Sequence, residues 1–309
     1  MKKSVDLLGL GIAPVDFFVS IDRHPPAGRK IDGLPGSALI AGGGPVPTAL
    51  CTFSRFGGSA SLITAFGDDQ WGFFARQELD RFGVDHRPCL TRKHCPSALA
   101  FAWIERPSGN RTIVLDMSGR LFIAPRDLRL SSLPRPKLIH LDGRHLTACR
   151  KLARWGKSVG ARIMLDVGSV RNRVDDLFPY LDFLVCADQY ALAYFSARSL
   201  TKAAAGFKAL GIPEVVVTTG LRGSYGIDSD GRSHYQPAFR VKTVDVTGAG
   251  DVYHGAYLYG ILRGWDLETK MRLASAAAAL KCRQPGARLG IPTLRQTLAF
   301  MKKGRLYHD

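Results

Sequence analysis

Short apolar runs alternate with helix-like stretches along most of this chain of 309 residues. The runs that have the length of buried strands are Val5–Leu10, Ser61–Ala65, Leu138–Leu141, Arg162–Asp166, Phe183–Cys186 and Glu214–Thr218. The stretches of helical period between them are Thr48–Phe56, Trp71–Arg81, Thr147–Val159, Tyr190–Ala197 and Thr201–Leu210. Strands that alternate with helices in this way form a parallel sheet with helices on both faces. The pattern therefore predicts one α/β domain over residues 1–309 with a mostly parallel central sheet.

Two regions break this alternation, because their apolar runs have no helix between them. These runs are Asp16–Ile21, Ala38–Ala41, Ala98–Ile104 and Thr112–Leu115. The last two flank the polar turn Glu105–Asn110, which contains Pro, Gly and Asn and is typical of a β-hairpin. Together the segments 13–41 and 97–116 predict a small antiparallel sheet that projects from the main domain. We call these two segments the lid.

Composition narrows the class of partner. The chain has 43 Lys and Arg against 26 Asp and Glu, a formal net charge of +17, and such a surplus attracts polyanions. The basic residues are nevertheless spread along the chain, without a helix-turn-helix or zinc-finger spacing, so we expect no nucleic-acid partner. An anionic small substrate and a phosphorylated cofactor would suit the same charge. No apolar stretch reaches 18 residues, which predicts no membrane partner.

The six cysteines lie far apart, without a CxxC pair or a nearby His at metal-ligand spacing. This usage predicts reduced thiols and a cytoplasmic location. The amino-terminal segment begins with two lysines, but Asp6 and the run Pro14–Asp16 interrupt the apolar residues that follow. We therefore interpret it as a first strand and not as a signal peptide.

The segment that most directly predicts chemistry is a glycine loop, Gly248-Ala249-Gly250-Asp251, which opens a stretch of helical period through Leu262. Glycines let the backbone approach a ligand closely, and the free N–H groups of a helix N-terminus bind anions. Phosphoryl transfer needs such a site together with a group that accepts the proton of the nucleophile. Asp251, in the first helical turn, is placed for that second role. An ordinary helix cap is the structural alternative.

The run Asp245–Asp251 resembles the D-T-x-G-A-G-D signature of the ribokinase-like (PfkB) carbohydrate kinases. Ala41–Ala49, Gly67–Gly72 and Thr218–Gly223 resemble further landmarks of that family and occur in its order over nearly the whole chain. The resemblance implies a ribokinase-like α/β fold and phosphorylation of a small-molecule sugar, with ATP and Mg²⁺ as cofactors. It also implies a lid that closes over the sugar and often serves as the interface of a homodimer.

The same resemblance implies roles for individual residues. Asp251 would be the general base, and the anion hole would be formed by Gly248, Ala249 and Gly250. The sugar would contact Asp16, Gly42 and Gly43. The residues that would border ATP are Thr218, Gly220, Gly223, Lys281 and Gly286. A monovalent cation such as K⁺ would be held by Asp245 and Thr247.

The chain departs from the family pattern at two functional positions. Pro47 replaces an asparagine that commonly contacts the sugar, and proline has no side-chain donor. The N-x-x-E motif that helps to place Mg²⁺ is also absent, which leaves Asp188 as the only carboxylate in the corresponding stretch. The resemblance thus implies that Asp188 takes the metal role of that motif.

The carboxy-terminal run Ala279–Pro292 resembles the sulfofructose kinase branch of the family. In that branch an arginine that binds the anionic group stands where this chain has Arg144, and a guanidinium suits sulfonate or phosphate. On the second lid strand, however, Leu115 cannot hydrogen-bond an anion and Asp116 would repel one. Whether the sugar is anionic stays open at this point.

Two other functions remain open from the sequence. A nucleoside kinase of the same fold would want an aromatic platform in the lid, which Phe17, Phe101 and Trp103 could supply. A catalytically silent sugar-sensing protein would explain the missing N-x-x-E motif. His254, one helical turn after Asp251, is interpreted as a helix-packing histidine.

Overall fold

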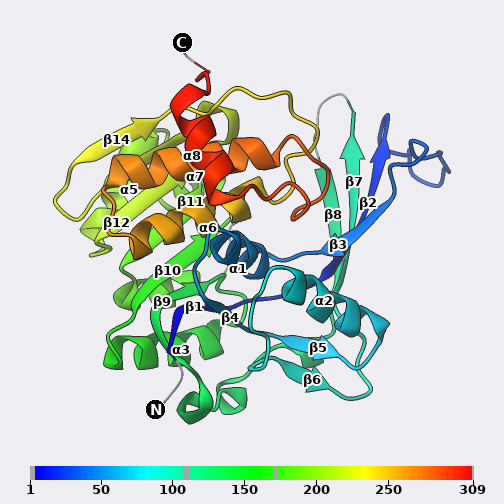
Figure 1. Cartoon of the computed structure of the whole chain (residues 1–309), viewed down its shortest axis with the longest axis horizontal. Coiled ribbons are helices and arrows are strands. Elements are labelled where there is room, and N and C mark those ends of the chain that lie inside the picture. The colour runs from blue at the N-terminus through cyan, green and yellow to red at the C-terminus, as the bar shows by residue number, and fades with distance from the viewer. Residues whose placement is uncertain (1–3, 107–110, 170–172, 308–309) are drawn as a thin grey trace.

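The computed structural model describes residues 4–106, 111–169 and 173–307. Its main sheet has eight strands in the order β14-β13-β12-β11-β10-β9-β1-β4 (Figure 1). They span Ser4–Leu10 (β1), Ala60–Ile63 (β4), Arg135–Leu141 (β9), Arg162–Val167 (β10), Phe183–Ala187 (β11), Glu214–Thr218 (β12), Ser224–Ile227 (β13) and Ser233–Gln236 (β14). All neighbours from β4 to β12 pair in parallel, and only β13 and β14 are antiparallel. The predicted mostly parallel sheet is confirmed.

Helices cover both faces of this sheet. They are α1 (Pro45–Arg55), α2 (Gln70–Arg81), α3 (Leu146–Ser158), α4 (Asp188–Tyr194), α5 (Leu200–Ala209), α6 (Ala249–Leu262), α7 (Leu267–Lys281) and α8 (Leu294–Lys303). Short 3₁₀ turns span Gly119–Leu121, Pro125–Asp127, Leu130–Ser132, Val174–Tyr180 and Gly220–Arg222. Strand residues alternate between two cores: Val216 of β12 packs with α1, α6 and α7, whereas Val215 and Val217 pack with α3, α4 and α5. No described helix has both the length and the apolar character needed to cross a membrane.

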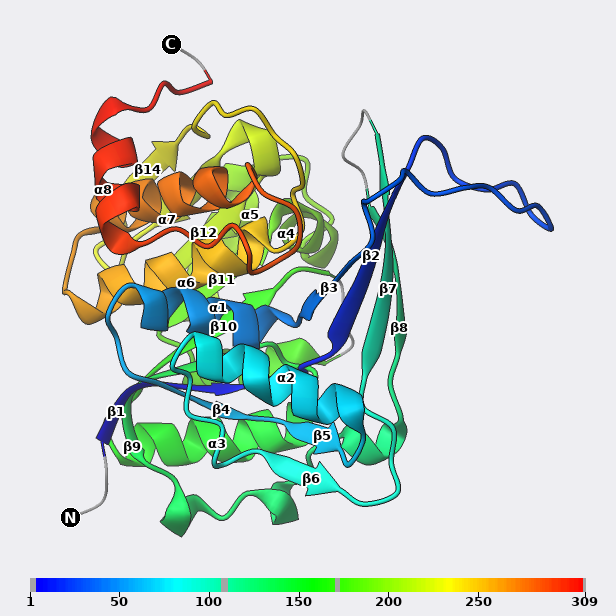
Figure 2. The ribbon, with the colours of Figure 1, turned by 45° about the vertical axis from the view of Figure 1, so that its right-hand side comes forward.

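The lid forms a separate four-stranded sheet in the order β3-β2-β7-β8. Its strands are β2 (Val15–Ile21), β3 (Leu39–Gly42), β7 (Leu99–Glu105) and β8 (Arg111–Asp116), which stand beside the main domain in Figure 2. Two of its pairings are antiparallel as predicted, but β2 and β7 are parallel. The predicted small sheet is confirmed as a separate, antiparallel-containing sheet, in which the two antiparallel pairs join through the parallel pairing of β2 with β7. The turn 107–110 lies outside the described residues.

The strand register assigns the lid side chains to two faces. Asp16 pairs with Ala100 and Ala100 with Leu115, so these three side chains share one face. Phe17 pairs with Phe101 and therefore lies on the opposite face. We call the face that carries Asp16 the inner face and the other the outer face.

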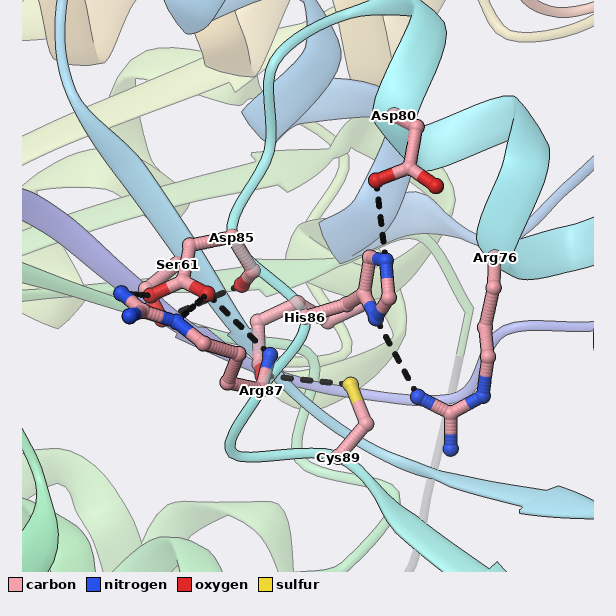
Figure 3. A network of polar contacts seen from close by, with 8 residues as sticks. Ser61, Arg76, Asp80, Asp85, His86, Arg87 and Cys89 are labelled. Carbon is pink, nitrogen blue, oxygen red and sulfur yellow. Dashed lines mark hydrogen bonds and ion pairs between the residues drawn. The ribbon is translucent and has the colours of Figure 1, made fainter.

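A smaller pair of strands, β5 (Ala65–Gly67) and β6 (Leu90–Arg92), extends the domain beside α2. The connection from α2 to β6 is fixed by polar contacts (Figure 3). His86 lies between Asp80 Oδ1 at 2.9 Å and Arg76 Nη1 at 3.2 Å, and Arg87 pairs with Asp85. These contacts tie the connection to α2, and Oγ of Ser61, which donates to the carbonyl of Asp85 at 3.1 Å, joins it to β4 at the edge of the main sheet.

Candidate active site

Asp251 lies in the first turn of α6, where the helix N-terminus favours an anionic group. The preceding Gly248 has a left-handed backbone with φ of 75°, and a Cβ atom there would lie only 2.8 Å from Cβ of Ala287. Only glycine fits this turn. The loop thus brings Asp251 and the start of α6 close to the segment that follows α7.

A cavity of about 340 Å³ opens at the start of α6. Its wall includes Thr218, Gly220, Gly223, Ala249, Gly250, Arg111, Phe239, Tyr253, Ala278, Ala279 and Cys282. Three of the five residues expected to border ATP thus meet the glycine loop, whereas Lys281 and Gly286 are not part of this wall. Arg111, on the inner face of the lid, was not expected here, because nothing in its local sequence points to α6.

The glycine pair expected to contact the sugar lies against Asp16. A Cβ atom on Gly43 would stand 2.1 Å from Oδ1 of Asp16. Burial raises the pKa of Asp16 to about 7; the charge of Arg288 opposes this, and that of Asp251 adds to it. Asp16 therefore lies within reach of the charge of Asp251.

Arg288 braces the glycine pair and was missed at the sequence level. Its buried guanidinium donates from Nη2 to the carbonyl of Gly43 at 2.6 Å and from Nε to Oγ1 of Thr48 at 3.4 Å. A Cβ atom on Gly42 would lie 2.2 Å from Nη1 of Arg288. The arginine therefore requires glycine at that position. Its partners lie some 240 residues away in the chain, so no local pattern could reveal it.

Asp166 is a second residue that the sequence did not reveal. It lies near the carboxyl end of β10, and its Oδ2 is 3.2 Å from Nδ1 of His254. Asp166, Asp251 and His254 each offer a ligand atom within 4.8 Å of the others. The sequence had suggested that His254 only packs the helix. In the structure it also faces the carboxylate of Asp166 beside the expected base.

The electrostatics of this group follow from burial and charge. Burial raises the pKa of Asp251 to about 6; Asp166 adds to this, while His254, Arg111 and Arg288 oppose it. Burial alone would lower the pKa of His254, but Asp166 and Asp251 reverse that effect and raise it. The two carboxylates thus favour the protonated form of His254.

The neighbouring His140 is uncharged. Its ring lies 5.9 Å from that of His254, and burial together with the charge of His254 lowers its pKa to about 3. Asp166, Asp251 and His254 thus form one polar cluster at the start of α6, with His140 beside it.

The expected metal ligands are engaged in protein contacts. Oδ2 of Asp188 accepts from Arg222 at 2.9 Å, and its Oδ1 accepts from the amide of Gln189 at 2.8 Å. Both oxygens of Asp188 thus have donors already, and the residue does not fit a Mg²⁺ ligand in this arrangement.

Asp245 is also surrounded by donors. Its Oδ1 accepts from the amide of Thr247 and its Oδ2 from the amide of Gly286, both at 2.8 Å. The Nζ atom of Lys281 donates to the carbonyl of Asp245 at 2.8 Å. Instead of bordering the cavity, Lys281 and Gly286 tie the glycine loop to the segment after α7.

Arg144 lies at the carboxyl end of β9, next to the end of β1. Its backbone amide donates to Oδ1 of Asp142 at 2.9 Å, and Oδ2 of Asp142 accepts from the amide of Ile12 at 3.1 Å. The side chain of Arg144 is exposed at this edge of the sheet.

Residues 35–294 match the model of the pfkB family carbohydrate kinases. The chain belongs to this family. It is 25% identical to a ribokinase of Haemophilus influenzae over 98% of this chain and 99% of that protein. It is 27% identical to fructokinase-2 of Oryza sativa over 90% of this chain and 89% of that protein.

Solved structures share this fold. A ribokinase of Thermotoga maritima superposes with a TM-score of 0.82 at 20% identity over 96% of this chain and 99% of its own. An adenosine kinase of Sinorhizobium meliloti superposes with a TM-score of 0.83 at 22% identity, over 97% of this chain and 99% of its own. The fold is ribokinase-like, and the protein is a phosphotransferase of the carbohydrate kinase family.

Proposed function

We propose that this kinase transfers the terminal phosphoryl group of ATP to a hydroxyl of a sugar, with Asp251 as general base. The observation that carries the proposal is the neighbourhood of Asp251. It directly follows Ala249 and Gly250, which line the cavity together with Thr218, and its charge raises the pKa of the buried Asp16. A base with a pKa of about 6 is mostly ionised at neutral pH and can accept a hydroxyl proton.

In this mechanism Asp16 accepts hydrogen bonds from sugar hydroxyls and Asp251 accepts the proton of the attacking hydroxyl. The amides at the start of α6 stabilise the charge that develops on the transferred group. When bound, Mg²⁺ would neutralise phosphate charge, and because Asp188 does not fit as its ligand we assign no step to the metal. The apolar wall of Phe239, Ala278 and Ala279 would take the adenine ring.

We further propose that the sugar carries an anionic group, such as a sulfonate or phosphate, and that Arg144 binds it. The resemblance to the sulfofructose kinase branch and the net charge of +17 support this. The expected repulsion between Asp116 and an anionic sugar carries less weight in the structure. Asp116 pairs with Leu99, and this register puts its side chain on the outer face with Phe101, away from Asp16. Leu115 remains on the inner face and supplies no polar contact.

The nucleoside alternative loses support by the same register. Its aromatic platform would have to lie on the inner face, but Phe17, Phe101 and Trp103 all lie on the outer face. A silent sugar-sensing protein would have no need for an intact glycine loop or a base with a raised pKa. We therefore favour a sugar kinase over both alternatives.

We also propose that the protein is a homodimer through the outer face of the lid. Ile40, Phe101 and Val114 expose 43%, 39% and 51% of their surface there, and an exposed apolar face of this kind is typical of a protein interface.

The free cysteines are in keeping with a cytoplasmic location.

The test of substrate is ATP consumption with a panel of neutral, phosphorylated and sulfonated ketoses and aldoses. For the best anionic substrate, Arg144→Met should lower kcat/KM by an amount equivalent to about 2–4 kcal/mol of lost transition-state stabilisation. The kcat/KM for a neutral analogue should change little. Equal losses on both substrates would show that Arg144 supports the fold. A parent enzyme that prefers a plain neutral ketose or ribose would refute the anionic substrate and leave sugar phosphorylation intact.

A further inference from the structure

The contacts of Asp245 disagree with the monovalent-cation site that the family resemblance implies. A bound K⁺ needs several oxygen atoms that can turn toward it. At this position both carboxylate oxygens of Asp245 already accept amide hydrogens from Thr247 and Gly286. Its carbonyl oxygen accepts from Nζ of Lys281 at 2.8 Å. Oγ1 of Thr247 is the one buried oxygen in this group without a hydrogen-bond partner among the described residues, and a single oxygen does not make a cation site.

We propose that the ammonium group of Lys281 is a built-in substitute for the activating monovalent cation, so that this kinase works without K⁺. The inference rests on the proposed phosphotransfer to a sugar and adds how the anion-binding loop is held. The side chain of Lys281 is fully buried, at 0% exposure, which excludes a role as a solvated surface charge. A buried ammonium group persists only where it has partners, and here its partner is the carbonyl at the start of the glycine loop.

The charges around Lys281 act on its pKa in both directions, and the net direction is downward. Burial lowers the pKa most, and Arg111 acts in the same direction, whereas Asp245, Cys282 and Asp251 favour the charged form. Lys281 is thus within reach of the charges of both Asp245 and the expected base.

Lys281 also explains how two distant segments are kept together. It is the last residue of α7, and its contact with Asp245 joins that helix end to the loop that precedes α6. The amide of Gly286 binds Asp245 from the same segment, and Ala287 lies directly against Gly248. A cation at this point thus organises the backbone whose amides receive the transferred phosphoryl group, which is a positioning role.

The first experiment uses the parent enzyme, assayed with KCl, NaCl or tetramethylammonium chloride at equal ionic strength. We expect rates within about twofold of one another, because the positive charge is covalently supplied. A parent enzyme that is several-fold faster in K⁺ than in tetramethylammonium would overturn the proposal. This arm requires no variant and so does not depend on how a substitution folds.

The second experiment removes the charge with Lys281→Met, which keeps most of the side-chain volume. We expect a loss of about 10–100-fold in kcat/KM in tetramethylammonium, as for a lost supporting partner, with part of the activity regained in K⁺ or NH₄⁺. Arg283→Met is the matched control, because it removes an equal charge from an exposed position two residues away. It should show neither the loss nor the cation response.

Thermal melting separates this proposal from the proposed function. Lys281→Met should melt higher in KCl than in tetramethylammonium chloride, whereas the parent and Arg283→Met should not. If the parent phosphorylates no sugar, the proposed function fails while the melting experiment still tests the cation. A folded Lys281→Met protein that responds to K⁺ neither in melting nor in activity would overturn the substitution of Lys281 for the cation.

Discussion

Replacing His254 by Gln removes a buried positive charge from beside the expected base and keeps a polar side chain of similar length. His254 pairs with Asp166 at 3.2 Å and stands within 4.8 Å of a carboxylate oxygen of Asp251. Its charge favours the ionised form of Asp251, while Asp166 opposes it. We expect His254→Gln to raise the pKa of Asp251 above its value of about 6.

The size of this effect follows from the distance. The ligand atoms of His254 and Asp251 lie within 4.8 Å of each other, and two unit charges at that separation interact by about 3.5 kcal/mol at an effective dielectric constant of ~20, which equals ~2.5 pH units. Burial, the largest influence on the pKa of Asp251, and the charges of Arg288 and Arg111 are the same in parent and variant. We therefore expect the acid limb of the kcat/KM profile to move upward by about one to two pH units.

The assay measures kcat/KM against pH for the parent and the variant with the same sugar and the same nucleotide, so that ionisation of the nucleotide cancels in the comparison. His140→Gln serves as the control, because His140 is equally buried in this group but uncharged, and its loss should leave the limb in place. Asp166→Asn should move the limb in the opposite direction, to lower pH, because it removes a like charge from Asp251.

A merely structural role for His254 would lower the rate at every pH without displacing the limb. An acid limb that stays within a few tenths of a pH unit in His254→Gln, or moves downward, would refute the electrostatic reasoning. Displacement in the same direction in both His254→Gln and Asp166→Asn would refute it as well, since the two charges have opposite signs.

Four further predictions concern the base and the lid. Asp251→Asn should lower turnover by about 10²–10⁴-fold, as for a lost general base, and a single-turnover rate within about threefold of the parent would place the base elsewhere. The same variant should be more stable than the parent at pH 8, by about 1–2 kcal/mol after allowance for its partial exposure. The sign follows because folding raises the pKa of Asp251 from 3.8 to about 6. The contribution of this carboxyl to the free energy of unfolding is fully present below pH ~4 and is lost as the pH rises through ~6. Melting curves that show no advantage of Asp251→Asn at pH 8 would contradict this expectation. Residues 97–106 and 111–116 should gain protection from hydrogen exchange when substrate and a non-hydrolysable ATP analogue bind, and unchanged exchange there would exclude lid closure. Phe101→Glu should shift the mass measured by light scattering from dimer to monomer, whereas an unchanged mass would place any interface outside the outer face.

Local sequence determined the layout of the domain and the position of the expected base. The predicted strands and helices recur in the structure with bounds that differ by a few residues, because hydrophobic period depends only on neighbours along the chain. The glycine loop was recognisable for the same reason, since Gly248 and Asp251 are close in the sequence and their geometry is that of one helix N-terminus.

The tertiary structure alone decided which other groups meet that base. Asp166 of β10 reaches His254 because α6 packs against the main sheet, and Arg288 reaches Gly43 across nearly the whole chain. Strand register, which depends on pairing between segments far apart, decided that Asp116 shares the face of Phe101 and not that of Asp16. The contact of Lys281 with the carbonyl of Asp245 was equally invisible, because a sequence specifies a lysine but not the oxygen that its ammonium group finds after folding.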